Sequence, residues 1–161
     1  MADDRDPGPA LSRRLGYLLK HAMLILEELH EEYMAPTGVT VRELGVLLML
    51  ADREPESQQQ AARRLGVDRT TMVGLLDVLE AKSLVARRPD SADRRRNVVE
   101  LTATGRTVLD QATRASDEAE QAFLAGLGDD GASRLRALLG QIALGESSEP
   151  REDASRLRSE P

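Results

Sequence analysis

The stretch GVDRTTMVGLLDVLEAKSLVARRPDSADRRRNVVELTATGR, Gly66 to Arg106, decides which fold the chain adopts. It begins with a glycine suited to a left-handed turn and with Asp68, a residue type that caps helices. Apolar residues at helical spacing then extend from Arg69 to Lys82. Two short runs that are compatible with strands follow, Leu84 to Arg88 and Asn97 to Leu101, on either side of a Pro-Asp-Ser turn. The pattern predicts a helix followed directly by a β-hairpin.

The segments around this stretch complete the order of elements. A short helix that ends at Leu65 lies before Gly66, so the two helices form a helix-turn-helix. Thr40 to Asp52 is a mostly apolar helix further upstream. Downstream, Thr102 can cap a long alanine-rich helix from Ala103 to about Leu127, and a last helix covers Ala132 to about Leu144. The order predicts a mainly α fold with a small β-hairpin wing, an α+β winged helix-turn-helix.

The first helix, Leu11 to about Ala35, has more apolar surface than one partner requires. Its apolar residues cover roughly 160° of the helix, whereas packing on one neighbour needs about 100°. We therefore expect this helix to contact both its own domain and a second subunit.

The charge of the chain is distributed unevenly. The 161 residues have a net charge of −6, yet the segment from Arg53 to Arg106 has a net charge of +3 and the remainder −9. A basic segment in an acidic chain is a possible electrostatic footprint for DNA, or it is ordinary surface scatter. Aromatic residues make up only 2%, which is too few for a platform that stacks single-stranded bases. Duplex DNA is therefore the favoured nucleic acid.

Several classes of function are disfavoured. The absence of cysteine excludes disulfides, thiolate metal sites and thiol redox switches. His21 and His30 lie nine residues apart on one helix, so they face opposite sides and cannot form a metal pair. The sequence GLGDDG, residues 126–131, follows a helix rather than the strand that a dinucleotide-binding loop requires. We expect no catalytic set, no cofactor and no membrane segment, and we expect a cytoplasmic protein.

The helix from Arg69 to Lys82 is expected to read DNA. Its outward face has short side chains that suit the major groove, and its first turn is where such helices approach bases and phosphates. The three arginines of the hairpin tip suit a narrow minor groove. The alternatives are a solvent-facing helix and arginines that pair with Asp90 and Asp93. The predicted DNA-binding residues are Arg69, Thr70, Thr71, Gly74, Arg94, Arg95 and Arg96.

The stretch from Gly66 to Arg106 resembles the MarR family of bacterial transcription regulators. The family shows an Asp-Arg-Arg wing followed by Leu-Thr-x-x-Gly, which correspond here to Asp93-Arg94-Arg95 and Leu101 to Gly105. Ser83 is a departure, because the family usually has glycine there. The resemblance covers about residues 11–144 and implies a homodimer that reads a near-palindromic site, with Arg95 and Arg94 contacting the minor groove.

The resemblance, with the polar and proline-containing composition of both ends, indicates an organisation of the chain. We expect a flexible tail at residues 1–10, an N-terminal dimerisation helix at 11–35 and a winged helix-turn-helix domain at 36–102. C-terminal dimerisation helices then cover residues 103–144, and a disordered tail covers 145–161.

A bound small molecule is the expected switch, since no thiol exists to be oxidised. The resemblance implies a ligand crevice between the dimerisation helices and the winged domain. Tyr17 and His21 are neighbours on the first helix, with Arg14 one turn before them, so a small aromatic or anionic effector is the predicted ligand. The alternative is that all three residues are solvated or pack at the dimer interface. The rival function is a winged-helix module that binds protein and not DNA.

Overall fold

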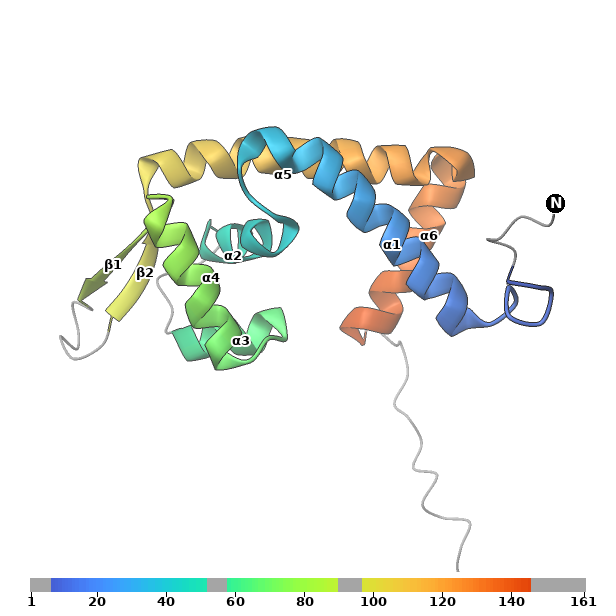
Figure 1. The fold of residues 1–161 in the computed structure, drawn as a ribbon, viewed down its shortest axis with the longest axis horizontal. Coiled ribbons are helices and arrows are strands. Elements are labelled where there is room, and N and C mark those ends of the chain that lie inside the picture. Colours follow the sequence, from blue (N-terminus) through green and yellow to red (C-terminus); the bar gives the residue numbers. More distant parts are fainter. Residues whose placement is uncertain (1–6, 52–57, 90–96, 146–161) are drawn as a thin grey trace, which may run out of the picture. The chain divides into compact units, whose positions relative to one another are not determined.

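The computed structural model describes residues 7–51, 58–89 and 97–145. It consists of helices and one antiparallel hairpin (Figure 1), in agreement with the predicted fold class. In chain order the elements, with η denoting a 3-10 helix, are α1 (Leu15–Met34), η1 (Ala35–Thr37), α2 (Val41–Ala51), α3 (Gln58–Leu65), α4 (Arg69–Ala81), β1 (Val85–Pro89), β2 (Asn97–Leu101), α5 (Ala103–Leu124), η2 (Ala125–Leu127) and α6 (Gly128–Leu144).

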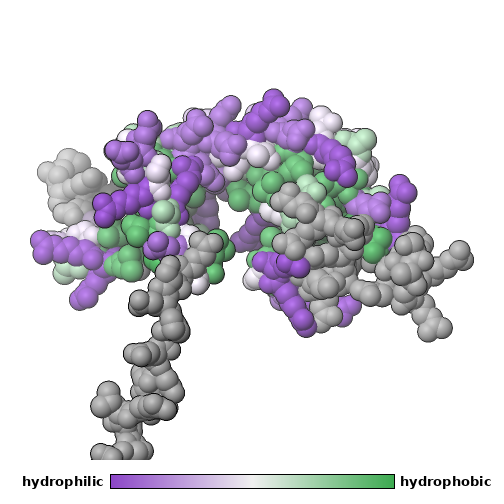
Figure 2. Space-filling view, turned by 180° about the vertical axis from the view of Figure 1, so that it is seen from behind, coloured by the Kyte–Doolittle hydropathy of each residue, from purple (hydrophilic) through white to green (hydrophobic). Residues whose placement is uncertain are grey.

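Helix α1 starts later than its apolar spacing indicates. The backbone of Arg14 is extended, with φ −80° and ψ 126°, so the helix begins at Leu15 and not at Leu11. Figure 2 shows apolar side chains at the surface between hydrophilic ones. On α1 the exposed large apolar residues are Leu15, Leu18, Leu19, Met23, Leu24 and Ile25. In a single chain much of the apolar stripe of this helix is therefore uncovered.

Helices α3 and α4 form the predicted helix-turn-helix. Gly66 has a φ of 64°, which an L side chain rarely adopts. Asp68 then caps α4, because its Oδ1 accepts a hydrogen bond from the backbone N–H of Thr71 at 2.9 Å. The cap predicted from the sequence is confirmed.

The end of α4 is a left-handed turn at Ser83. This residue has a φ of 58° and is the only non-glycine with positive φ among the described residues. The N–H of Leu84 donates to the carbonyl of Leu79 at 2.9 Å, and the N–H of Ser83 donates to the carbonyl of Glu80 at 2.8 Å. This is the Schellman arrangement, which usually places glycine at the left-handed position. Ser83 therefore takes the conformation that glycine would take more easily.

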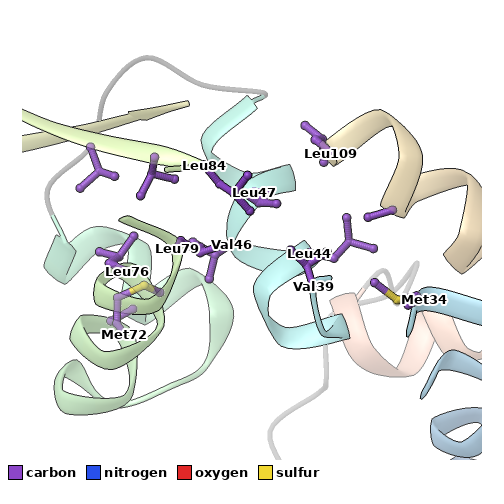
Figure 3. Packing of buried hydrophobic residues seen from close by; sticks show 14 residues of the cluster. Met34, Val39, Leu44, Val46, Leu47, Met72, Leu76, Leu79, Leu84 and Leu109 are labelled. Atoms are coloured by element: carbon purple, nitrogen blue, oxygen red, sulfur yellow. The ribbon is translucent and has the colours of Figure 1, made fainter. Parts of the chain in front are cut away.

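The main core joins α2, α4, the hairpin and α5 (Figure 3). Val46 and Leu47 of α2 and Met72 and Leu79 of α4 are fully buried in it. Leu76 is buried as well, as the helical spacing predicted. The opposite face of α4 is consequently directed away from the core.

The two strands of the hairpin pair in one continuous antiparallel register. Val85 pairs with Leu101, and Pro89 pairs with Asn97 in an antiparallel ladder. Val85 and Val99 are buried and belong to the core cluster. The strands therefore fix the base of the wing on the domain.

The Leu-Thr-x-x-Gly motif connects the wing to α5. The hydroxyl of Thr102 donates to the carbonyl of Ser83 at 2.8 Å and accepts from the N–H of Gly105 at 2.9 Å. A Cβ on Gly105 would overlap the carbonyl oxygen of Leu84. The glycine of the motif is therefore required, because the backbone of α5 contacts the backbone of Leu84 at this position.

The chain divides into two compact units, residues 1–123 and 124–161. In the second unit α6 begins at Gly128, four residues before the predicted start at Ala132. Asp129 and Asp130 occupy its first turn, where carboxylates are favourable near the amide ends of a helix.

None of the described helices is by itself long and apolar enough to cross a membrane. One pair, residues 15–37 with 41–51, meets the length and composition test only when joined, and it is bent by 68°.

Candidate nucleic-acid interface

The first turn of α4 presents two of the predicted DNA-binding side chains. Arg69 and Thr70 are exposed, whereas Thr71 is half-buried. The Thr71 hydroxyl donates to Asp68 at 2.6 Å, so its proton is already used within the chain. The hydrogen bonds from the hydroxyl and backbone N–H of Thr71 lower the pKa of Asp68 below its ordinary value. The cap is thus ionised and holds the first turn in one geometry.

Gly74 lies on the outer face of α4, one turn after Thr70. It is exposed, and an added Cβ would meet no heavy atom within 4 Å. Nothing inside the chain therefore requires a glycine there, although glycine in a helix interior destabilises it by about 0.5–1 kcal/mol relative to alanine. A surface that approaches α4 closely from outside would account for the missing side chain.

Arg87 connects the wing to α4, the predicted recognition helix. Its guanidinium donates to the carboxylates of Asp77 and Glu80 on α4. The hydrogen bond to Asp77, with the nearby charge of Glu80, raises the pKa of Arg87. The Arg87 side chain is 22% exposed, and that of Asp77 is 58% exposed. One of the arginines around the wing therefore serves an internal contact and neutralises an acid on the outer face of α4.

The tip of the wing lies beyond the described ladder. The last described strand pair is Pro89 with Asn97. The predicted contact residues Arg94, Arg95 and Arg96 lie outside the described residues. Their role stays a prediction.

A separate cavity of about 710 Å³ lies between α1, η1 and the start of α2. Its α1 side combines three apolar residues with three ionisable ones, and its wall includes the backbone turn at Gly38. Its polar members come from both helices. The lining residues are Met23, Leu26, Glu27, His30, Glu31, Met34, Ala35, Gly38, Val39, Thr40, Val41 and Arg42. The cavity therefore combines apolar wall with both signs of charge.

The predicted effector residues lie further toward the start of α1. The rings of Tyr17 and His21 are neighbours, with centroids 4.0 Å apart, as their spacing predicted. Arg14 precedes the helix as its N-cap residue and is exposed. None of the three lines the described cavity, and their role in ligand binding stays a prediction. His30, which the sequence analysis considered only as a metal ligand, does line it.

His30 is a buried polar residue of this cavity. Its Nε2 lies 3.0 Å from the hydroxyl of Ser116 on α5. This hydrogen bond joins two residues that are 86 positions apart in the sequence. In the sequence His30 lies among glutamates, Glu28, Glu31 and Glu32, a pattern that does not predict a buried histidine, so only the tertiary contact identifies it.

The second buried polar residue, Glu43, is beside the same cavity wall. Its Oε1 accepts from the Nζ of Lys82 at 2.7 Å, and its Oε2 accepts from the N–H of Thr40 at 2.6 Å. Burial alone would raise the pKa of Glu43, but the hydrogen bonds from Lys82 and Thr40 outweigh it and lower the pKa. Thr40-Val-Arg-Glu43 is a capping-box pattern that the sequence analysis did not single out.

Metal binding finds no support in the part of the chain that the structure describes. No group of three or more His, Asp or Glu residues is arranged there to hold an ion.

Comparisons with known proteins agree with this geometry. A model of the MarR family matches residues 37–96. The HTH-type transcriptional repressor YetL of Bacillus subtilis is 31% identical in an alignment of 113 residues that covers 62% of this chain and 68% of YetL. The repressor NicR of Pseudomonas putida is 31% identical over 100 residues, 62% of this chain, and the match spans only 63% of NicR.

Solved structures extend the likeness over more of the chain. The transcriptional repressor CouR bound to a 23-mer DNA duplex has a TM-score of 0.79 at 34% identity, over 84% of this chain and 96% of that chain. CouR from Rhodococcus jostii RHA1 bound to p-coumaroyl-CoA has a TM-score of 0.74 at 31% identity, over 88% of this chain and 100% of that chain. The predicted fold and family resemblance are thereby confirmed, and the chain belongs to the MarR family of transcriptional regulators.

Proposed function

We propose that this chain is a sequence-specific regulator that binds double-stranded DNA as a homodimer, as a repressor that a small molecule releases. The observation that carries the proposal is the first turn of α4. There Arg69 and Thr70 are exposed beside the open space at Gly74, on a helix capped by Asp68. Helices presented in this way enter the major groove. CouR, which has the same fold, was bound to a DNA duplex.

The wing supplies the second set of contacts in this proposal. Arg94, Arg95 and Arg96 approach the minor groove, and Thr71 approaches the phosphate backbone. Arg87 supports both parts, because it joins the base of the wing to α4. Since DNA is the partner, the proposed site of action is the cytoplasm.

Dimerisation is proposed from the uncovered apolar surface of the terminal helices. On α1, Leu15 is 70% exposed and Ile25 is 53% exposed. On α6 the exposed apolar residues include Leu138, Leu139 and Ile142. Exposed apolar surface of this extent is typical of a protein–protein interface. A two-fold dimer then reads a pseudo-palindromic operator with one α4 in each half-site.

The effector in this proposal is an amphipathic anion that contains an aromatic ring. The cavity beside α1 offers apolar wall with Arg42 and His30 as partners for an anion, while Glu27 and Glu31 of the same lining restrict where its charge can lie. Arg14, Tyr17 and His21 are the second candidate position. CouR was bound to p-coumaroyl-CoA, an anion with an aromatic acyl group. A hundredfold loss of DNA affinity on binding requires about 2.7 kcal/mol of coupling.

Selection of a preferred duplex from a random pool, followed by salt-dependent binding measurements, tests the DNA part. Arg95→Ala should weaken binding to all sequences and reduce the salt slope by about one, because a cationic contact is lost. Thr70→Ala should change sequence preference by about 1–3 kcal/mol at a contacted base pair. Arg134→Ala, on α6, is the matched control. Failure of the parent to prefer any duplex would favour the protein-interaction module instead.

Titration of the protein–DNA complex with p-coumaroyl-CoA and with free p-coumarate tests the effector part. Arg42→Ala should abolish the response if the ligand uses the described cavity. His21→Ala should blunt it if the ligand uses the first turns of α1. An identical response of both variants and the parent would contradict both positions.

A further inference from the structure

Lys82 forms a clasp between the recognition helix and the wall of the cavity. Its Nζ donates to the carbonyl of Gly38 at 2.8 Å and to Oε1 of Glu43 at 2.7 Å. The Glu43 side chain is only 5% exposed, and that of Lys82 is 36% exposed. We call the contacts among Lys82, Glu43 and the Gly38 carbonyl the Lys82 clasp.

One side of the clasp is part of the cavity. Gly38 and Thr40 both line it, and Arg42 follows them along the same wall. The N–H of Thr40 donates to the same carboxylate of Glu43 that Lys82 contacts. The Glu43 N–H in turn donates to the Thr40 hydroxyl at 3.3 Å. The carboxylate is thereby fixed to the segment that an occupant of the cavity would touch.

The other side of the clasp is the end of α4. Lys82 is the C-cap residue, and its N–H donates to the carbonyl of Val78 at 3.0 Å. The left-handed Ser83 and the hydrogen bond from Leu84 to Leu79 follow immediately. The Lys82 backbone is therefore part of the turn that ends the recognition helix and begins the wing.

Separating the two sides is costly. Withdrawal of Lys82 would leave a buried carboxylate without its cationic partner, which is much less favourable than keeping the pair intact. When the cavity wall moves, the less costly response is for the end of α4 to move with it. The clasp thus favours joint movement over rupture.

We propose that Lys82 is a positioning residue that couples occupancy of the cavity to the placement of α4. An occupant that displaces residues 38–42 moves the C-terminal end of the recognition helix and thereby weakens DNA binding. This inference deepens the proposed function and rests on it. The competing route is the apolar packing of α2 on α4, whose residues Val46, Leu47, Met72 and Leu79 belong to one core cluster. This packing would transmit the movement without Lys82.

The absence of native cysteine permits a test that needs no known effector. Leu26→Cys places one thiol on the cavity wall, and benzyl methanethiosulfonate then attaches an aromatic group there. Glu28→Cys, an exposed position of α1 that does not line the cavity, is the matched labelling control. The measured quantity is the affinity of the full chain for the selected duplex, before and after labelling.

Labelling of the Leu26→Cys variant should weaken its DNA binding about tenfold, within the usual range of coupling between sites. The same labelling with Lys82→Met added should weaken it less than about twofold. Adding Lys20→Met instead, which changes the only other lysine, should preserve the full response. Equal losses with and without Lys82→Met would overturn the proposal in favour of the apolar route. No loss on labelling of Leu26→Cys alone would also overturn it.

A second variant and a second readout separate coupling from folding and from DNA binding. Lys82→Met with Glu43→Gln removes the clasp without leaving a buried charge unpaired, and it should lose the response as well. Hydrogen exchange of the Lys82, Ser83 and Leu84 amides should become faster when the Leu26→Cys thiol is labelled, and not when the clasp is removed. If no duplex binds, the proposed function fails, but the hydrogen-exchange measurement still tests the movement of α4. Unchanged exchange after labelling, with the clasp intact, would reject the coupling through Lys82.

Discussion

At the residue scale, Gly74 and Gly105 are glycines for opposite structural reasons: the space around one is open, and the space around the other is filled. The first has open space around it and the second has a carbonyl oxygen where a Cβ would be. A glycine in open space within a helix is not required by the fold. A glycine in backbone contact is required by it. Substitution with alanine therefore distinguishes a residue kept for a partner from one kept for folding.

Gly74→Ala should stabilise the chain and impair DNA binding. Alanine favours the helix by about 0.5–1 kcal/mol, and no atom of the chain opposes it. Denaturant unfolding and duplex affinity are the measurements. Gly16→Ala, at another exposed helical glycine with open space, should leave duplex affinity unchanged. A Gly74→Ala variant with parental duplex affinity would show that DNA does not approach this face.

Gly105→Ala should destabilise the chain by more than about 2 kcal/mol. The new methyl would overlap the carbonyl oxygen of Leu84, and a backbone atom cannot rotate away as a side chain can. Chemical denaturation followed by circular dichroism measures the change. Thr104→Ala, at the exposed neighbouring position of α5, is the control. A decrease in the free energy of unfolding of less than about 0.5 kcal/mol would mean that the backbones of Leu84 and Gly105 are not in contact in solution.

At the element scale, α4 is held at both ends by polar contacts and along its length by the core. Asp68 fixes its start, Arg87 joins it to the wing, and Lys82 joins its end to Glu43. The first contact is predictable from the sequence, because a cap acts within one turn. The other two join residues 10 and 39 positions apart, which local patterns do not pair.

The contribution of Glu43 to stability should depend on pH. Its pKa is lowered in the folded chain, so its stabilisation is present above the ordinary pKa of an exposed glutamate. That stabilisation is lost as pH falls through the folded pKa. Glu43→Gln should cost about 1–3 kcal/mol near neutral pH, and the difference from the parent should shrink as the pH falls below the ordinary pKa of a glutamate. A difference that stays constant over this range, relative to the exposed control Glu28→Gln, would contradict the ionised pair.

At the scale of the whole molecule, the uncovered apolar residues of α1 and α6 indicate that one chain is not the functional unit. Covering one such side chain stabilises an interface by about 1.5–3 kcal/mol. Single exposed apolar residues are normal on a protein surface, but several on the same helix indicate an interface. The winged domain itself has a buried core and does not need the partner for its packing.

Light scattering at micromolar concentration should therefore give a mass near twice the 17.6 kDa of the chain. Ile25→Glu should weaken association by at least about tenfold, because an unpaired carboxylate would enter the interface. Glu28→Gln is the charge-changing control on the same helix. A monomeric parent, or an Ile25→Glu variant that associates like the parent, would contradict the assignment of α1 as a dimerisation helix.

The sequence by itself determined the helix-turn-helix, the hairpin and the order of elements. These follow from apolar period, capping and turn residues, which act over a few positions: Asp68 caps its own helix, and Ser83 makes its own turn. Apolar spacing predicted that α1 starts at Leu11, because that spacing continues before the true first residue of the helix. Gly128 and Gly131 were interpreted as a break between helices, so α6 was predicted to start at Ala132. The actual starts are Leu15 and Gly128.

Only the tertiary structure decided which side chains meet. The cavity, the His30–Ser116 hydrogen bond and the Lys82 clasp each need segments that folding alone brings together. Tyr17 and His21 are neighbours on one helix and were predictable as a pair. The wall opposite His30 comes from η1 and α2 and was not predictable. Local pattern sets what a segment becomes, whereas a cavity or a buried ion pair depends on how segments pack, which is a property of the whole chain.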